Sequence, residues 1–248
     1  FKSLESIKWD LVIDLRNTII SRIIRKKKVI RFKVKNKNEH RVVSLCKLLN
    51  TNNIPPEIPI EKHDKINALN LLKKKGLKFP ILAVAPVTNW KRKNWPLDNF
   101  ALLINKLCNE KLASKLKFNS VIILGSKKEK YECDLLKSKI KFIKTINLAG
   151  KYNIKTLSTI IKNCKLFIGN DSGLMHLAAA TNIITLGLFG PSKDIHYKPW
   201  GENSHFLRTE KSYEELVLNK DYDRRLESSL MKSLTVAKVY KKCVKIIS

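Results

Sequence analysis

This 248-residue sequence lacks several features that mark particular classes of protein. The five cysteines show neither Cys-x-x-Cys spacing nor a neighbouring histidine cluster, so we expect reduced, mostly buried thiols and no metal site. No apolar run approaches the roughly 18 residues of a membrane-spanning helix, and the first residues do not resemble a signal peptide. The glycine fingerprint of dinucleotide-binding folds is also missing, which argues against an NAD or FAD enzyme. These absences predict a cytoplasmic protein without a bound cofactor.

Acidic residues are scarce relative to basic ones. The sequence holds 21 Asp and Glu against 50 Lys and Arg, which gives a formal net charge of +29 at pH 7. Residues 1–50 are the most basic part, with 14 Lys and Arg against 4 Asp and Glu, and they include the block Arg25–Lys28. Such a block could attract nucleic acid or an anionic membrane surface. A solvated, lysine-rich surface explains it as well, so charge alone does not identify a partner.

Apolar runs and turn residues predict strands that alternate with helices. The expected strands are Trp9–Leu15, Val29–Phe32, Ile81–Ala85, Ser120–Leu124, Ile146–Leu148, Leu166–Ile168 and Ile184–Leu188. The expected helices are Thr18–Arg25, His40–Leu49, His63–Lys75, Leu97–Lys111, Lys128–Ile140, Ile154–Asn163, Leu174–Thr181 and Thr235–Ile247. A proline-rich stretch at residues 54–59 cannot carry regular structure and suits a domain boundary. This order predicts βαβ units with right-handed crossovers around a parallel sheet.

The most informative segment is a polar corner between a predicted strand and a helix of small residues. Leu166–Ile168 is apolar enough for a strand that is covered on both faces, and Asp171, Ser172 and Gly173 follow it closely. Gly173 has no Cβ to keep a ligand away, and the free N–H groups at a helix start can hold an anion. His176 lies in the first helical turn, from where it can donate to a phosphate oxygen. The alternative is that Asp171 or Ser172 only caps the helix and that His176 is a surface histidine.

A longer motif surrounds this corner. The sequence Asp-Ser-Gly-x-x-His-Leu-Ala-Ala-Ala, followed after a predicted strand by Phe-Gly-Pro-Ser, resembles the ADP-heptose:lipopolysaccharide heptosyltransferases of glycosyltransferase family 9. The resemblance covers nearly the whole chain and is strongest between Pro80 and Pro199. It implies an α/β fold of GT-B type, with two Rossmann-like domains of which the first is incomplete. Residues 1–59 would be a remnant of the N-terminal acceptor-binding domain, residues 60–207 the C-terminal nucleotide-sugar-binding domain, and residues 208–248 a helical segment that packs back toward the first domain.

Three further loops at predicted strand ends match motifs of this family. Lys93 in Lys-x-Trp-Pro resembles the lysine that neutralises the sugar-nucleotide diphosphate, and Thr88, five positions earlier, resembles a hydroxyl residue that contacts it. Glu129 resembles the glutamate that binds ribose hydroxyls, and Tyr152 stands where the family holds adenine. Each also has a simpler explanation, namely a surface lysine, a carboxylate that complements a helix dipole, or a packed tyrosine. Together with the Asp171 corner, these loops predict one cleft for a mononucleotide diphosphate.

The resemblance implies the inverting transfer of a heptose from ADP-heptose to the inner core of lipopolysaccharide. The family's general base is an aspartate in a glycine-containing loop, which we expect upstream of Phe1, so the sequence is interpreted as an N-terminally truncated fragment without an assigned catalytic residue. Asp14 fits an element that borders the acceptor site, and Arg16 and Arg22 lie close to it in sequence. Ile20 replaces a basic residue of the family's pattern, which leaves the identity of the acceptor open.

Two other functions stay open on the sequence alone. A GT-B transferase that uses another nucleotide sugar would be distinguished by testing ADP against UDP and GDP. A basic nucleic-acid-binding protein would show a steep salt dependence of its affinity, but the sequence has no recognised reader motif, and we expect no specific nucleic acid. The expected partners are ADP-heptose, a lipopolysaccharide-core or lipid A-type acceptor and, through peripheral contact of the basic region, the anionic inner membrane.

Overall fold

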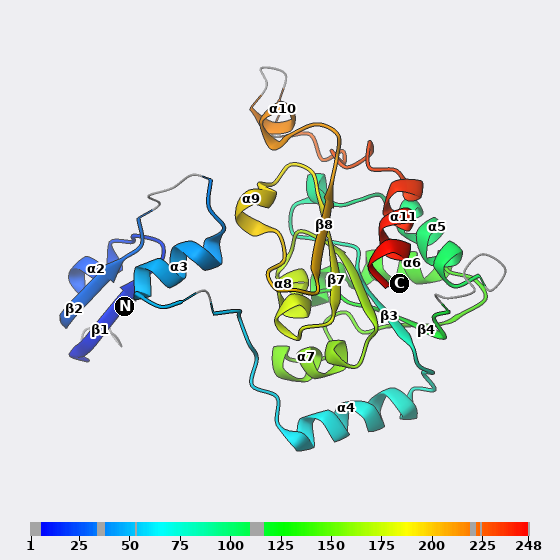
Figure 1. Ribbon diagram of the computed structural model, residues 1–248, viewed down its shortest axis with the longest axis horizontal. Helices are drawn as coiled ribbons and strands as arrows, with labels where there is room; N and C mark the ends of the chain where they lie inside the picture. Colours follow the sequence, from blue (N-terminus) through cyan, green and yellow to red (C-terminus); the bar gives the residue numbers. More distant parts are fainter. Residues whose placement is uncertain are drawn as a thin grey trace. The chain divides into compact units, whose positions relative to one another are not determined.

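The computed structural model describes residues 6–33, 38–52, 54–109, 117–218, 222–223 and 225–247 (Figure 1). Contacts divide the chain into two compact units, Phe1–Ile54 and Pro55–Ser248. The division falls at the start of the proline-rich stretch. The three domain limits expected from the sequence are finer than this division and stay predictions. The end of the expected helix Leu97–Lys111 lies outside the described residues.

Where the structure describes the first unit, it contains a pair of parallel strands and two helices. β1 (Trp9–Asp14) pairs with β2 (Lys26–Arg31), and α2 (Ile20–Ile23) connects them. α3 (Arg41–Leu49) follows, and the ring of its N-cap residue His40 accepts a hydrogen bond from a backbone N–H of the first turn. The connecting helix is only one turn long, shorter than expected, because strand pairing takes up the chain from Lys26 onward.

The second unit is built on six parallel strands in the order β5-β4-β3-β6-β7-β8. They are β3 (Ile81–Ala85), β4 (Ser120–Ile123), β5 (Lys144–Asn147), β6 (Leu166–Asn170), β7 (Ile184–Phe189) and β8 (Ser204–Arg208). Strands β4 and β5 are added outward from one edge of β3, and the chain then returns so that β6 pairs with the other edge. The topological switch point therefore lies between β3 and β6, which is where ligands bind in open α/β sheets.

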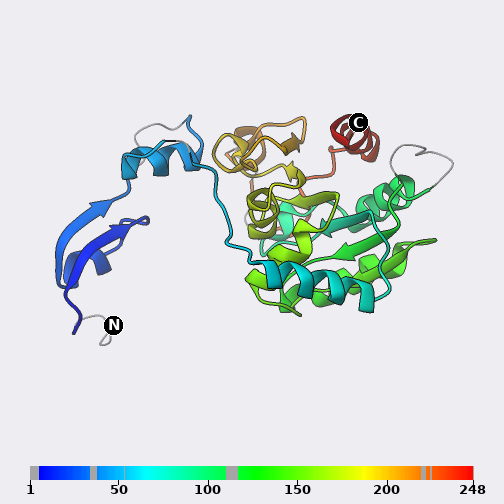
Figure 2. The same ribbon diagram turned by 60° about the horizontal axis from the view of Figure 1, so that its bottom comes forward.

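Helices cover both faces of this sheet. α5 (Leu97–Leu107), α6 (Lys130–Lys139) and α11 (Val236–Ile247) contribute to one hydrophobic core, and α4 (Lys62–Lys74), α7 (Ile154–Lys162) and α8 (Gly173–Ala180) contribute to the other. Figure 2 shows α4 and the C-terminal helix α11 on opposite sides of the strands. Side chains of a strand alternate between faces, so Leu82 and Val84 belong to the first core while Ile81, Ala83 and Ala85 belong to the second.

The remaining helices are short and lie in the connections. They are η1 (Lys91–Lys93), η2 (Lys127–Glu129), α9 (Asp194–Tyr197) and α10 (Tyr213–Val217). The sequence did not predict α9, α10 or the edge strand β8. All five β8 residues are only half-buried, so this strand lacks the apolar run that marks the inner strands.

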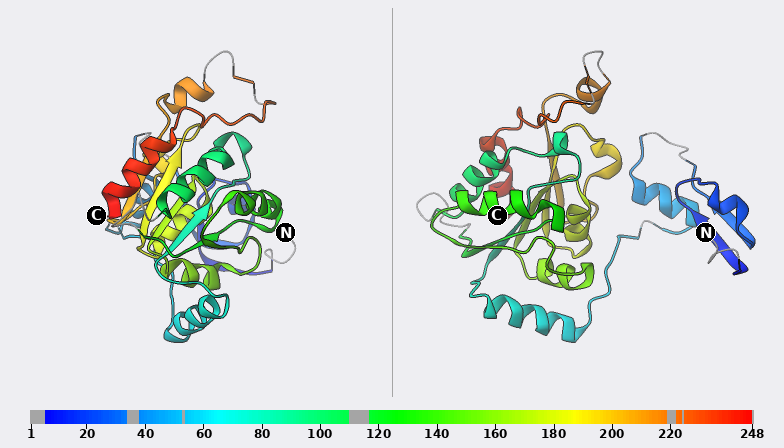
Figure 3. Two further views of the ribbon diagram at one scale, coloured as in Figure 1. Left: turned by 90° about the vertical axis from the view of Figure 1, so that its right-hand side faces the viewer. Right: turned by 180° about the vertical axis from the view of Figure 1, so that it is seen from behind.

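The C-terminal helix α11 packs within the second unit. Its buried residues Val239 and Cys243 belong to the core that contains α5, and Figure 3 shows α11 beside α5. The packing expected toward the first domain stays a prediction. In the part of the chain described, no helix combines the length and the apolar character needed to cross a membrane.

The five cysteines are free thiols, and four of them are buried. Burial raises the pKa of Cys133 to about 12, with nearby carboxylates adding to the effect, and burial also raises the pKa of Cys243 to about 12. These thiols therefore stay protonated and unreactive at neutral pH.

Candidate active site

The residues predicted to bind a donor come together in one cavity at the carboxyl ends of the strands. The cavity has a volume of about 720 Å³ and adjoins the switch point between β3 and β6. Every donor-side residue expected from the sequence lines it, namely Thr88, Lys93, Glu129, Tyr152, Asp171, Ser172, Gly173 and His176. The acceptor-side residues lie in the other unit.

The polar corner after β6 presents a helix start to this cavity. Ser172 is the N-cap of α8, but its side chain makes no capping hydrogen bond, and its Oγ is buried without a hydrogen-bond partner among the described residues. A Cβ placed on Gly173 would meet nothing within 4 Å. The simple capping role is therefore not what the Ser172 hydroxyl performs. The unpaired hydroxyl and the open approach to the first turn fit a site for an anion.

Lys93 reaches this corner from the loop after β3. Its Nζ lies 3.2 Å from Asp171 Oδ2, and the two side chains are 18% and 10% exposed. Partial burial reduces screening by water, so this contact is stronger than a pair on the open surface. The ion pair fixes the ammonium group beside the start of α8, where an anion would meet both.

His176 faces the same pair of charges. Exclusion of water by the surrounding protein lowers the pKa of this histidine, the negative charge of Asp171 opposes that effect, and the positive charge of Lys93 adds to it. The imidazole is therefore predominantly neutral at pH 7, although it stays open to the cavity. A neutral ring keeps one N–H with which to donate to a phosphate oxygen.

Thr88 forms its hydrogen bonds within its own loop. Its Oγ1 donates to the Trp90 carbonyl at 3.0 Å and accepts from the Trp90 N–H at 3.2 Å, while its own N–H donates to Asn94 Oδ1 at 2.9 Å. Direct donation to a ligand would require the hydroxyl to leave the Trp90 carbonyl. The structure therefore gives Thr88 a clear role in shaping the loop, and its expected contact with a diphosphate stays a prediction.

The loops after β4 and β5 close the other side of the cavity. Glu129 Oε2 accepts from the Ser126 N–H at 2.6 Å in a capping box, so this carboxylate both caps a helix and lines the cavity. Gly150 donates its N–H to the Gly125 carbonyl at 2.9 Å and has a φ of +68°. A Cβ at Gly150 would lie 2.6 Å from Lys127 Cα, so only glycine permits the close approach of the two loops.

Apolar side chains form the part of the wall beside these loops. They are Tyr152, Ile154, Leu157, Leu174 and Leu177. Ile154 is 70% exposed even though it is a large aliphatic residue, which suits a surface that a flat, apolar ligand group would cover. The sequence predicted only Tyr152 among them. It also missed Tyr197 of α9, which lines the same cavity and could not be placed because α9 itself was not predicted.

Asp14, which the sequence predicts on the acceptor side, stabilises a turn in the first unit. Its Oδ1 accepts from the Arg16 N–H at 3.0 Å, and its Oδ2 accepts from the Thr18 N–H at 2.7 Å. The nearby Ser21 hydroxyl, followed by these two N–H groups, lowers the pKa of Asp14 against an opposing effect of burial. A carboxyl with a lowered pKa is a poor proton acceptor, in keeping with its assignment outside catalysis. Arg16 and Arg22 are exposed.

A metal-binding cluster is not found among the described residues, where no three His, Cys, Asp or Glu side chains are grouped to hold an ion. The positive charge that the cavity offers to an anion comes from Lys93 and the start of α8. The arrangement can therefore bind a diphosphate through side-chain and backbone donors.

Comparison with known protein families matches the model described as glycosyltransferase family 9 (heptosyltransferase) over residues 31–224. Lipooligosaccharide heptosyltransferase 2 of Campylobacter jejuni subsp. jejuni serotype O:6 (strain 81116 / NCTC 11828) is 30% identical over 210 residues, covering 78% of this chain and 62% of the relative. Lipopolysaccharide heptosyltransferase 3 of Escherichia coli is 25% identical over 222 residues, covering 82% and 65%. The chain thus spans less than two thirds of the length of these relatives.

Solved structures share the fold. The glycosyl transferase family 9 structure from Veillonella parvula DSM 2008 matches with a TM-score of 0.78 at 19% identity, covering 98% of this chain and 74% of that chain. The structure of E. coli ADP-heptose lps heptosyltransferase II matches with a TM-score of 0.70 at 18% identity, covering 99% and 78%. These likenesses confirm the expected α/β fold of GT-B type.

Proposed function

Because this chain belongs to glycosyltransferase family 9, we propose that it carries the donor-binding part of a heptosyltransferase. The reaction is the transfer of a heptose from ADP-heptose to the inner core of lipopolysaccharide, with inversion at the anomeric carbon. The observation that supports this most strongly is the convergence of eight donor-side residues from four strand-end loops on one cavity. The names of the relatives, which are heptosyltransferases of lipopolysaccharide and lipooligosaccharide, support the same reaction.

In this proposal the diphosphate lies between Lys93 and the start of α8. Bond cleavage leaves negative charge on the departing diphosphate, and fixed donors that face this charge lower the barrier. Lys93 supplies a positive charge, the first N–H groups of α8 supply backbone donors, and His176 supplies a neutral ring N–H. Asp171 holds the lysine in place through their 3.2 Å contact. Each hydrogen bond to a charged group contributes about 1.5–3 kcal/mol.

The nucleoside lies against the loops after β4 and β5. Glu129 accepts hydrogen bonds from the ribose hydroxyls through the carboxylate that also caps η2. The adenine covers the apolar wall, where Tyr152 and the exposed Ile154 offer a surface for a flat ring. A different nucleotide sugar stays the alternative, and binding of UDP or GDP in preference to ADP would identify it.

We assign the remaining parts of the chain by the same resemblance. Residues 1–59 belong to the acceptor-binding domain, with Asp14, Arg16 and Arg22 on the acceptor side, and residues 60–207 form the donor domain. Residues 208–248 form the C-terminal segment. The basic block Arg25–Lys28 makes peripheral contact with anionic lipid at the inner membrane, since each lysine near such a surface contributes about 1 kcal/mol.

Calorimetric titration of the chain with ADP tests this proposal. We expect ADP to bind more tightly than UDP or GDP, and Lys93→Ala to weaken ADP binding by about 10- to 100-fold, because a charge-assisted contact is lost and Asp171 is left unpaired. Lys91→Ala is the matched control, because it removes the same charge from the same short helix but lies outside the donor cavity, in an exposed pair with Glu227. Equal ADP affinity in all three proteins, or no ADP binding at all, would contradict the proposal.

A further inference from the structure

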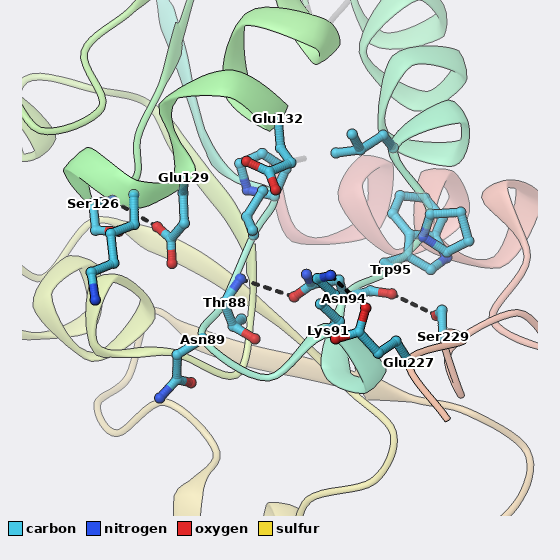
Figure 4. Close-up of a pocket in the computed structure, with 15 residues that line it drawn as sticks. Thr88, Asn89, Lys91, Asn94, Trp95, Ser126, Glu129, Glu132, Glu227 and Ser229 are labelled. Carbon is cyan, nitrogen blue, oxygen red and sulfur yellow. Dashed lines mark hydrogen bonds and ion pairs between the residues drawn. The ribbon is translucent and has the colours of Figure 1, made fainter. Parts of the chain in front are cut away.

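The loop that carries Thr88 and Lys93 is held from outside the donor cavity by a distant part of the chain. We call residues 88–95 the donor loop and residues 227–234 the strap. Figure 4 shows the strap residues Glu227 and Ser229 facing Lys91 and Asn94 of the donor loop. Both segments line a second cavity of about 630 Å³, which shares Thr88 and Glu129 with the donor cavity.

Several hydrogen bonds join the strap to the donor loop. Ser229 Oγ donates to the Asn94 carbonyl at 2.6 Å, and the Leu230 N–H donates to the Arg92 carbonyl at 3.0 Å. The indole N–H of Trp95 donates to the Leu234 carbonyl at 2.7 Å, and Trp95 is fully buried. The strap therefore fixes backbone groups at several positions of the loop.

The strap is itself anchored. Met231 and Leu234 are fully buried in the core that also contains α5 and α11. The Met231 N–H donates to Ser229 Oγ at 3.0 Å, so this hydroxyl accepts from the strap while it donates to the loop. A hydroxyl bonded in both directions has one preferred orientation, and it links the rigid core to Asn94.

Asn94 connects the strap to the start of the donor loop. Its Oδ1 accepts the Thr88 N–H at 2.9 Å, which closes the loop on itself. The neighbours Arg92 and Lys93 contact different parts of the chain. Arg92 is buried and lies 4.5 Å from the centre of the Tyr222 ring, whereas Lys93 lies beside Asp171 in the donor cavity. The strap thus holds the backbone on both sides of Lys93, through the Arg92 and Asn94 carbonyls, while Asp171 holds its ammonium group.

We propose that Ser229 is a positioning residue for the donor diphosphate. It lies outside the donor cavity and acts through the Asn94 carbonyl, the donor loop and Lys93. A loop held before binding spares the ligand the cost of ordering it, so loss of the Ser229 hydroxyl weakens diphosphate binding without removing any contact to the ligand. This inference rests on the proposed function, because it requires Lys93 to bind the donor diphosphate.

A double-mutant cycle with ADP as the titrated ligand tests the role of Ser229. We expect Ser229→Ala to raise the Kd for ADP by about 3- to 10-fold, the range of one lost hydrogen bond. In a Lys93→Ala background the same substitution changes the Kd by less than about twofold, because the residue through which it acts is absent. Ser229→Thr keeps the hydroxyl and restores most of the affinity. Glu227→Gln is the control on the strap, since Glu227 belongs to an exposed ion pair and its loss leaves the Kd unchanged.

The outcomes separate the two proposals. A Ser229→Ala penalty that persists in full without Lys93 would overturn the positioning role, because it would reflect a general loss of structure. An unchanged Kd in Ser229→Ala would overturn it as well. Failure of the unaltered chain to bind ADP would instead overturn the proposed function, and the positioning role with it.

Discussion

The two units of this chain hold their functional residues in different ways. In the second unit every residue of β3 is fully buried, and the donor loop after it is tied to β6 and to the strap. In the described residues of the first unit β1 has a single partner strand, and its Leu11 and Ile13 are 44% and 41% exposed. The hydrogen bonds of the Asp14 carboxylate there come from the Arg16 and Thr18 N–H groups and from Ser21, all within seven positions of it along the chain. The cavity of the second unit is thus preorganised by long-range contacts, whereas the Asp14 carboxylate depends on groups close to it in sequence.

Substitution of Asn170 is expected to weaken the long-range contacts of the second unit most strongly. It is fully buried, and its amide accepts the Trp95 N–H at 3.1 Å and donates to the Pro86 carbonyl at 2.7 Å, so it ties the end of the donor loop and the segment just before it to β6. Asn170→Leu leaves two buried backbone groups unpaired. We expect it to lower the free energy of unfolding of the second unit by about 2–6 kcal/mol. Hydrogen exchange of the β3 amides under native conditions measures this loss.

Asp14→Asn is the control for that experiment in the first unit. Its side chain keeps one of the two acceptor oxygens that the turn uses, and the residue lies in the other unit, so exchange of the β3 amides stays unchanged. A large change in Asp14→Asn, or none in Asn170→Leu, would show that the two units are not held in different ways.

The charge state of His176 makes ligand binding in the donor cavity depend on pH. Its pKa lies below the usual 6.5, so an anionic ligand that raises this pKa must bind together with a proton. Each unit by which the ligand raises the pKa of His176 strengthens binding by up to about tenfold at a pH below the pKa of the ligand-free protein. Titration with ADP at pH 6 in two buffers of different ionisation enthalpy measures the proton uptake. His176→Gln removes the contribution of His176, and equal uptake in both proteins would refute its role.

In the absence of ligand, the lowered pKa of His176 makes the folded state less stable at low pH, whereas ligand binding becomes stronger there. The folded state has the lower pKa, so it binds a proton less readily than the unfolded chain. The contribution of His176 to stability is therefore present above pH 6.5 and is lost as the pH falls below that value.

A smaller effect is expected at the apolar wall. Ile154 is 70% exposed, so Ile154→Ser leaves the free energy of unfolding within about 0.5 kcal/mol of its original value. It removes apolar area that a base would cover, and we expect the Kd for ADP to rise about 2- to 5-fold while that for inorganic pyrophosphate is unchanged. Leu226→Ser is the matched control, because Leu226 is 54% exposed but does not line the cavity. Equal losses for ADP and pyrophosphate would place the base elsewhere.

Local sequence patterns predicted the parts of the fold that depend on burial. β3 has its expected bounds because its five residues are all apolar and covered on both faces. The edge strand β8 was missed because half-buried residues do not form an apolar run. The motifs that contain Lys93 and Asp171 could be found because each consists of neighbouring residues: a lysine before Trp-Pro, and Asp-Ser-Gly at the start of a helix.

The contacts that position those motifs could not be predicted in the same way. Ser229 lies 135 positions from Asn94 and has no sequence signal of its own. Asn170 directly precedes the Asp171 corner in sequence, but its bonds to Pro86 and Trp95 depend on the pairing of β3 with β6. Such contacts follow from the order of strands in the sheet, which no single segment specifies.

The proposed function requires four strand-end loops of the second unit to bind one nucleoside diphosphate. Backbone amide chemical shifts followed during an ADP titration test it most directly. We predict that the shifts concentrate at Lys93, Gly125, Gly150 and Gly173, one position from each loop, and that the amides of β1 and β2 do not move. Shifts confined to the first unit, or dispersed over residues that do not line the donor cavity, would contradict the account.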